Sequence, residues 1–139
     1  MQTSVATFLA LDVGAQRIGV ARANSIARIA SPLTTLQHTD QVLSDIAQLV
    51  KQEQADELVV GLPRGLESQE TDQTRYVRQF VADLQTHITI PIHFQDEALT
   101  SVTAKKELEA RKKPYAKGEV DALAATYILN DYLGQKGAF

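Results

Sequence analysis

Residues 8–21 read FLALDVGAQRIGVA. An apolar run that begins at Phe8 ends in the carboxylate of Asp12 and in Gly14, and a second apolar run, Ile18 to Ala21, follows. This pattern predicts two strands joined by a short turn. Aspartate is a poor strand residue, and at the end of an apolar strand it costs stability unless it is solvated, hydrogen-bonded or bound to a cation. Asp12 is therefore either part of an ordinary hairpin or a functional carboxylate.

The composition predicts a single domain over residues 1–139 with one hydrophobic core, because 44% of the residues are hydrophobic and 22% are charged. Cysteine is absent from the sequence, which excludes disulfides and leaves oxygen or imidazole as the ligands for any metal. No apolar run approaches the length of a membrane span and no signal peptide is recognisable, so we expect a cytoplasmic protein without a membrane partner. The net charge of −3 argues against indiscriminate coating of nucleic acid but permits a local basic patch.

The rest of the chain alternates strand and helix patterns, which indicates an α/β domain. The expected elements are an edge strand at 26–30, an amphipathic helix over 39–54, a central strand at 57–62, a helix through 76–84, a strand at 90–94, a helix through 104–108, a mobile loop at about 111–118 and a final helix over 120–133.

Further carboxylates stand where these elements end or begin. The strand at 90–94 continues into Asp96 and Glu97, and Asp121 lies in the expected first turn of the final helix. Parallel strands bind ligands at their carboxyl ends, so Asp12, Glu97 and Asp121 come together if the first and last strands are near neighbours. Such an oxygen-only cluster suits Mg²⁺ or Mn²⁺, and two such ions about 4 Å apart can activate a water against a phosphodiester. Asp96 is the alternative to Glu97.

Basic residues crowd one segment that carries only two acids. They could hold a polyanionic backbone, which makes affinity salt-dependent, or they could form a solvated helix face. Arg17 is either a salt-bridge partner on the hairpin or a clamp for a phosphate. The three histidines lack metal-ligand spacing and receive no role. The basic residues of the segment are Lys105, Lys106, Arg111, Lys112, Lys113 and Lys117.

Four blocks in order, at residues 12–21, 59–63, 96–101 and 120–133, resemble the bacterial YqgF/RuvX family, whose members are described as nucleases that mature the 5′ end of pre-16S rRNA and as Holliday-junction resolvases. The resemblance implies a ribonuclease H-like fold with a mixed five-stranded sheet flanked by helices. It also implies metal-dependent hydrolysis of phosphodiesters, with Asp12, Glu97 and Asp121 as the metal ligands.

The chain departs from the family pattern at three places near these blocks. The family often has Thr-Lys where this chain has Ala15-Gln16, an arginine where it has Ala98, and Leu-Asn where it has Arg64-Gly65. Two positive charges near the presumed scissile phosphate are thereby lost. Arg64 could compensate for them.

Several interpretations of partner and activity remain open from the sequence. The substrate is structured RNA, such as precursor rRNA, or branched DNA, since both are recognised largely by shape and backbone charge. A non-cleaving RNA-binding ribosome-assembly factor is the main rival. An actin-like ATPase is disfavoured because the chain has no room for a second lobe. The sequence identifies no dimer face, so both a monomer and a homodimer are compatible with it.

Overall fold

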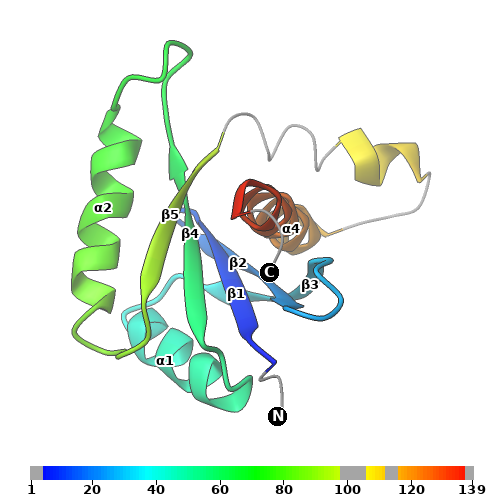
Figure 1. Cartoon of the computed structure of the whole chain (residues 1–139). Helices are drawn as coiled ribbons and strands as arrows, with labels where there is room; N and C mark the ends of the chain where they lie inside the picture. Colours follow the sequence, from blue (N-terminus) through cyan, green and yellow to red (C-terminus); the bar gives the residue numbers. More distant parts are fainter. Residues whose placement is uncertain (1–4, 98–105, 112–115, 137–139) are drawn as a thin grey trace.

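The computed structural model describes residues 5–97, 106–111 and 116–136. Its centre is one mixed sheet with the strand order β3-β2-β1-β4-β5 (Figure 1). The first three strands are antiparallel neighbours, whereas β4 and β5 run parallel to β1. The mixed five-stranded sheet implied by the resemblance is therefore confirmed. The strands are β1 (Thr7–Val13), β2 (Arg17–Asn24), β3 (Ser31–Gln37), β4 (Glu57–Pro63) and β5 (Ile92–Glu97).

Helices cover both faces of this sheet (Figure 1). On one face lie α1 (Val42–Gln52) and α2 (Asp72–Leu84), and on the other lies α4 (Lys117–Lys136). The helix α2 begins at the N-cap Thr71, whose side chain accepts a hydrogen bond from the backbone N–H of Thr74. A short helix at 106–110 lies beside α4. The amphipathic helix predicted over 39–54 and the helix predicted through 76–84 are thus confirmed as α1 and α2.

The two faces of the sheet have different cores. The α1 and α2 side is filled by large residues such as Leu11 and Val60. The α4 side contains small residues such as Ala10 and Ala21, with Ile128 of α4 packed over them. Small side chains allow a helix to approach the sheet closely. This close approach positions the candidate site described below.

The prediction of an edge strand at 26–30 was wrong, because these residues form the connection between β2 and β3. The side chain of Asn24 accepts hydrogen bonds from the backbone N–H groups of Ile26 and Ala27, at 3.0 and 2.8 Å, and so offers the backbone a turn instead of a ladder. Arg28 then adopts a left-handed φ of 56°. The true edge strand, β3, begins at Ser31, directly before a proline that an edge position tolerates.

Two element boundaries also differ from the prediction in ways that matter for function. The final helix begins at Lys117, so residues 117 and 118 are helical and Asp121 lies in its second turn. The last strand extends to Glu97, which makes Asp96 and Glu97 strand residues. Residues 112–115 of the predicted loop and residues 98–105 of the preceding segment lie outside the described residues.

None of the helices in the described part of the chain has the length and apolarity needed to cross a membrane.

Candidate active site

Three carboxylates lie at one end of the sheet, on the face covered by α4. Asp12 is the penultimate residue of β1 and Glu97 is the last residue of β5. Side chains alternate along a strand, so Asp12 points to the same face as Ala10, which packs against α4. Asp121 projects from α4 itself. The predicted strand ends are thus brought to one edge, although β4 separates β1 from β5.

The side chain of Glu97 reaches from β5 towards β1 by lying over Gly61 of β4. The strand register places Asp12 next to Gly61, since the preceding pair is Leu11 with Val60. A Cβ atom built on Gly61 would lie 2.2 Å from Oε2 of Glu97 and 2.5 Å from Cδ1 of Ile128. The carboxylate of Glu97 therefore occupies the space that a side chain at position 61 would fill. A glycine inside an apolar strand is the sequence signal of such a close approach.

A second glycine sets the position of Asp121. A Cβ atom on Gly19 of β2 would lie only 1.9 Å from the backbone carbonyl oxygen of Asp121. The backbone of α4 is thus packed directly on β2, and Gly19 is also the strand partner of Asp12. Because position 19 has no side chain, the backbone of α4 at Asp121 can lie directly against β2, next to Asp12.

The electrostatics of the site reflect this crowding. Burial raises the pKa of Asp12 to about 7, and the neighbouring Asp121 carboxylate adds to the rise. Burial likewise raises the pKa of Glu97 to about 8, with the Asp12 carboxylate as the second cause. Asp12 therefore interacts with both other acids. Oε2 of Glu97 is buried without a hydrogen-bond partner among the described residues.

Arg17 engages the third carboxylate. Its Nε donates to Oδ2 of Asp121 at 2.7 Å, and the side chains are 27% and 20% exposed. Of the two roles the sequence left open for Arg17, the ion pair is present in the structure, although its partner lies on α4 and not on the hairpin. The turn between β1 and β2 is closed by the backbone N–H of Gly14, which donates to the Arg17 carbonyl at 2.9 Å. His38 supports the same turn, with Nδ1 2.7 Å from the Gly14 carbonyl oxygen.

The structure separates Asp96 from Glu97. The side chain of Asp96 is 66% exposed and its Oδ1 accepts from Nε of Arg64 at 3.3 Å. Glu97, one residue further along β5, faces Asp12 over Gly61. It is therefore Glu97, and not Asp96, that the structure brings together with Asp12.

Within the described ranges, no three carboxylate or imidazole groups lie close enough together to hold one metal ion. The three acids form a row in which Asp12 is central, and Asp121 is turned to Arg17. An oxygen-only donor set, a buried oxygen without a partner and two carboxylates that resist ionisation nevertheless fit a divalent cation in their chemistry. Binding one would require the side chains to move.

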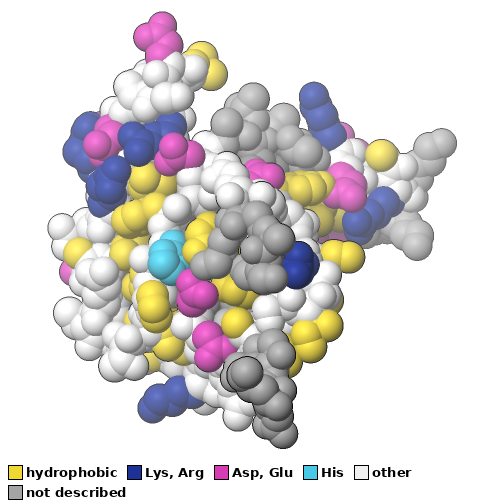
Figure 2. Space-filling model, viewed as in Figure 1, with side chains coloured by type: hydrophobic (Ala, Val, Ile, Leu, Met, Phe, Trp, Pro, Cys, Tyr) yellow, Lys and Arg dark blue, Asp and Glu magenta, His cyan; other side chains and the backbone are white. Residues whose placement is uncertain are grey.

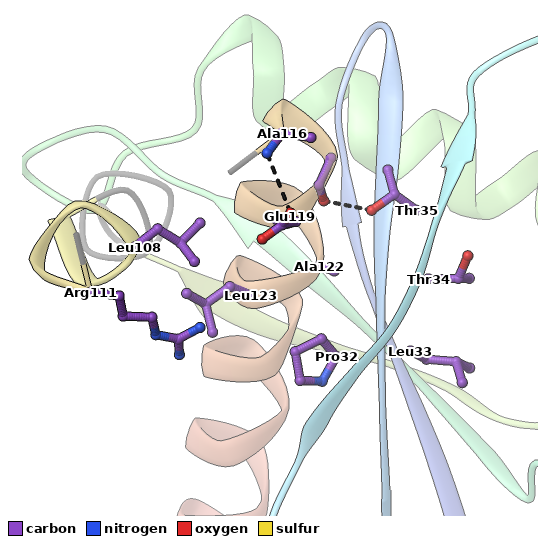
Figure 3. Close-up of a pocket in the computed structure, with 11 residues that line it drawn as sticks. Pro32, Leu33, Thr34, Thr35, Leu108, Arg111, Ala116, Glu119, Ala122 and Leu123 are labelled. Atoms are coloured by element: carbon purple, nitrogen blue, oxygen red, sulfur yellow. Dashed lines mark hydrogen bonds between the residues drawn. The ribbon is translucent and has the colours of Figure 1, made fainter. Parts of the chain in front are cut away.

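The predicted basic segment is described only in part. Lys106 is the first described residue of the short helix beside α4, and Arg111 directly follows this helix. Lys117 is the exposed first residue of α4. Lys105, Lys112 and Lys113 lie outside the described residues. Arg111 lines a pocket of about 410 Å³ between β3, the short helix and α4 (Figure 3). Its other walls are mostly apolar, and the pocket lacks the three acids.

A second group of arginines lies near the loop that follows β4, and the sequence indicated only Arg64 of this group. Basic and acidic side chains alternate over this region (Figure 2). In addition to the Arg64 pair with Asp96, Arg78 pairs with Glu70 at 2.8 Å and lies 5.4 Å above the Phe94 ring. Because these cations already have acidic partners, the region is mixed in charge.

The sequence is similar to those of known proteins along almost its whole length. Residues 6–135 match the family described as RuvX, Holliday junction resolvase. A protein of Sulfurihydrogenibium sp. (strain YO3AOP1) named "Putative pre-16S rRNA nuclease" is 39% identical over 127 residues, which cover 90% of this chain and 88% of that protein. One of Crocosphaera subtropica with the same name is 41% identical over 134 residues, 94% of each chain.

Solved structures share the fold at low identity. The structure of T. thermophilus RuvC in complex with Holliday junction substrate matches with a TM-score of 0.56 and 13% identity, over 95% of this chain and 97% of that one. The complex of Fowlpox virus resolvase with Holliday junction DNA gives 0.54 and 10%, over 94% and 99%. These matches confirm the ribonuclease H-like fold. With residues 6–135 matched and relatives of 39% and 41% identity along nearly its whole length, the chain belongs to the RuvX family.

Proposed function

We propose that this protein is a divalent-metal-dependent nuclease that hydrolyses phosphodiester bonds in the 5′-end maturation of pre-16S rRNA. The names of its relatives support the substrate. The observation that carries the proposal is the row of Glu97, Asp12 and Asp121 on one face at the carboxyl end of β1 and β5. Placing three acids together costs stability, and a cation that they share would offset that cost.

The metal proposed here is Mg²⁺ or Mn²⁺, held by Asp12, Glu97 and Asp121. These ions prefer carboxylate oxygens and water and accept phosphate oxygens at the remaining positions. When bound, such an ion activates a water and stabilises the leaving oxygen of a phosphodiester. The chain supplies the rest: Gly61 keeps the Glu97 carboxylate close to Asp12, and α4 packed on Gly19 brings Asp121 to the same place.

Cations around the site would hold the substrate backbone. Phosphate contacts by Lys and Arg position a nucleic acid without reading its sequence, which suits a substrate recognised by shape. Arg17 lies directly beside the acids and Arg64 follows the end of β4. The proposed backbone-binding residues are Arg17, Arg64, Lys105, Lys106, Arg111, Lys112, Lys113 and Lys117.

The test compares cleavage of a labelled precursor-rRNA fragment by wild type and by Asp12→Asn, Glu97→Gln and Asp121→Asn, with Mg²⁺, with Mn²⁺ and with chelator. All three variants should lose at least about 100-fold in rate while remaining folded. Asp96→Asn is the matched control, because it removes an exposed carboxylate next to Glu97, and it should retain activity. Equal loss in the control would contradict the assignment of the site.

A four-way DNA junction belongs in the same experiment, because the family description names Holliday junction resolvase. Preferred cleavage of the junction would move the substrate from RNA to branched DNA and leave the site unchanged. Binding of either substrate by folded wild type without any metal-dependent product would overturn the nuclease proposal in favour of a non-cleaving assembly factor.

A further inference from the structure

The position of Arg17 is compatible with two roles, an ion pair with Asp121 and a contact with a substrate phosphate, and the two can be combined. The backbone of Arg17 is fixed at the start of β2, where its carbonyl accepts from Gly14 and its strand partner is Gln37. The side chain crosses to α4, 104 residues along the chain, and binds Asp121 through Nε. A fixed backbone with a long, partly exposed side chain can reach more than one partner.

The charges around Arg17 define what it does in the absence of metal. Of the three acids, Asp121 alone has an ion-pair partner in the described part of the chain. Oδ2 of Asp121, an oxygen that a cation would need, is occupied by the guanidinium. No group of three metal ligands is preformed among the described side chains.

We propose that Arg17 is an exchangeable counter-ion, which holds Asp121 while the metal is absent and is displaced by the arriving ion towards the substrate phosphate. The inference rests on the proposed nuclease function and deepens it. A divalent cation and a guanidinium compete for the same carboxylate, because each neutralises it. The displaced guanidinium remains next to the metal site, where a phosphodiester brings the negative charge that it can bind in a charge-assisted hydrogen bond.

The competing explanation is that Arg17 only positions Asp121 as a ligand. The two explanations predict opposite changes in metal affinity when Arg17 is removed. If Arg17 positions Asp121, its removal weakens metal binding. If Arg17 competes with the metal, its removal strengthens metal binding, by roughly two- to five-fold if the ion pair has the strength usual for partly exposed pairs.

The experiment titrates Mn²⁺ alone, without nucleic acid, into wild type, Arg17→Gln and Arg17→Lys, and measures affinity by electron paramagnetic resonance. Arg17→Gln should bind Mn²⁺ more tightly than wild type, and Arg17→Lys, which keeps the charge, should stay near wild type. The matched control is Arg22→Gln, on the same strand, where Arg22 pairs with Glu53 at 3.0 Å. This control should not change Mn²⁺ affinity.

A second readout follows Arg17 itself. The Nε–H resonance of Arg17, assigned by its loss in Arg17→Lys, should shift when Mg²⁺ is added to wild type, because the hydrogen bond to Asp121 is broken. Unchanged or weaker Mn²⁺ binding by Arg17→Gln, or an unmoved resonance in protein saturated with Mg²⁺, would overturn the counter-ion role and leave the nuclease proposal intact. Absence of Mn²⁺ binding by wild type would overturn both.

Discussion

The substitution Gly61→Ala tests the geometry of the site with a single methyl group. The added Cβ would lie 2.2 Å from Glu97 Oε2 and 2.5 Å from Ile128 Cδ1. Ordinary van der Waals contact requires about 3.4 Å or more, so each neighbour must move by roughly 1 Å. The two neighbours differ in their freedom to move. Glu97 can rotate its carboxylate away from Asp12, whereas Ile128 is fully buried in the α4 core.

The expected loss of stability follows from this asymmetry. Overpacking of a core typically costs about 1–3 kcal/mol, and the alanine returns about 0.5–1 kcal/mol of chain entropy. The net loss should lie between about 0 and 2.5 kcal/mol, which corresponds to a fall in Tm of up to roughly 10 °C for a chain of this size. The loss of function should be far larger, because the carboxylate of Glu97 is driven from its place beside Asp12.

Thermal denaturation and Mn²⁺ titration measure the two effects separately. The matched control is Gly134→Ala in α4, where a Cβ meets nothing within 4 Å, and it should stabilise the protein by about 0.5–1 kcal/mol. In Gly61→Ala, the pKa of Glu97 should also fall from about 8 towards its ordinary value, because the group leaves its buried position. Wild-type Mn²⁺ affinity and cleavage in Gly61→Ala would refute the role given to this glycine.

Three further outcomes are expected. Gly19→Ala should cost more than about 3 kcal/mol of stability, seen as a collapse of Tm, because its Cβ would meet backbone of α4 at Asp121, which cannot rotate away; a Tm close to wild type would contradict the close packing. Asp12 and Glu97 have pKa values of about 7 and 8 in the folded protein and so bind protons that the unfolded chain has released. The stability that these two groups contribute to chelator-treated protein should therefore be fully present below about pH 4 and be lost as the pH rises through 7 to 8, so that wild type loses at least about 1 kcal/mol more than Asp12→Asn between pH 4 and 8; the same pH dependence of Tm in the two proteins would contradict the raised values. Removing the described basic residues of the 105–117 segment should lower the slope of log affinity against log salt by up to about 2.7, whereas removing Lys51 at the end of α1 should leave the slope unchanged; an unchanged slope in the triple variant would remove the segment from the interface. That triple variant is Lys106→Gln, Arg111→Gln and Lys117→Gln.

Most elements were predictable because their signals are local. The apolar run before Asp12, the near-continuous run from Leu58 to Leu62 and the helical spacing of Val42, Ile46 and Val50 each fix an element without reference to the rest of the fold. The edge strand failed because Asn24 diverts the backbone into a turn by hydrogen bonds from its side chain. The spacing of apolar residues carries no information about a hydrogen bond between a side chain and the backbone.

The sequence singles out the three acids of the candidate site but not the groups that surround them. An aspartate at the end of an apolar strand carries its own signal, since it contradicts the propensity of its neighbours. The contact of Gly19 with α4 and the ion pair of Arg17 join positions about 100 residues apart. Nothing in the local sequence identifies Asp121 as the partner of Arg17. Only the packing of α4 on β2 makes that choice.

The adjacent pair Asp96 and Glu97 shows how a small change in an element's length decides the chemistry. A strand that ended at Phe94, as the sequence suggested, would leave both acids in a turn where either could serve. Because β5 continues to Glu97, side-chain alternation gives the two residues opposite faces. Asp96 becomes an exposed partner of Arg64. Glu97 enters the space left by Gly61, where burial and Asp12 keep its pKa at about 8. The three added residues of strand thus convert two equivalent carboxylates into one surface group and one candidate ligand.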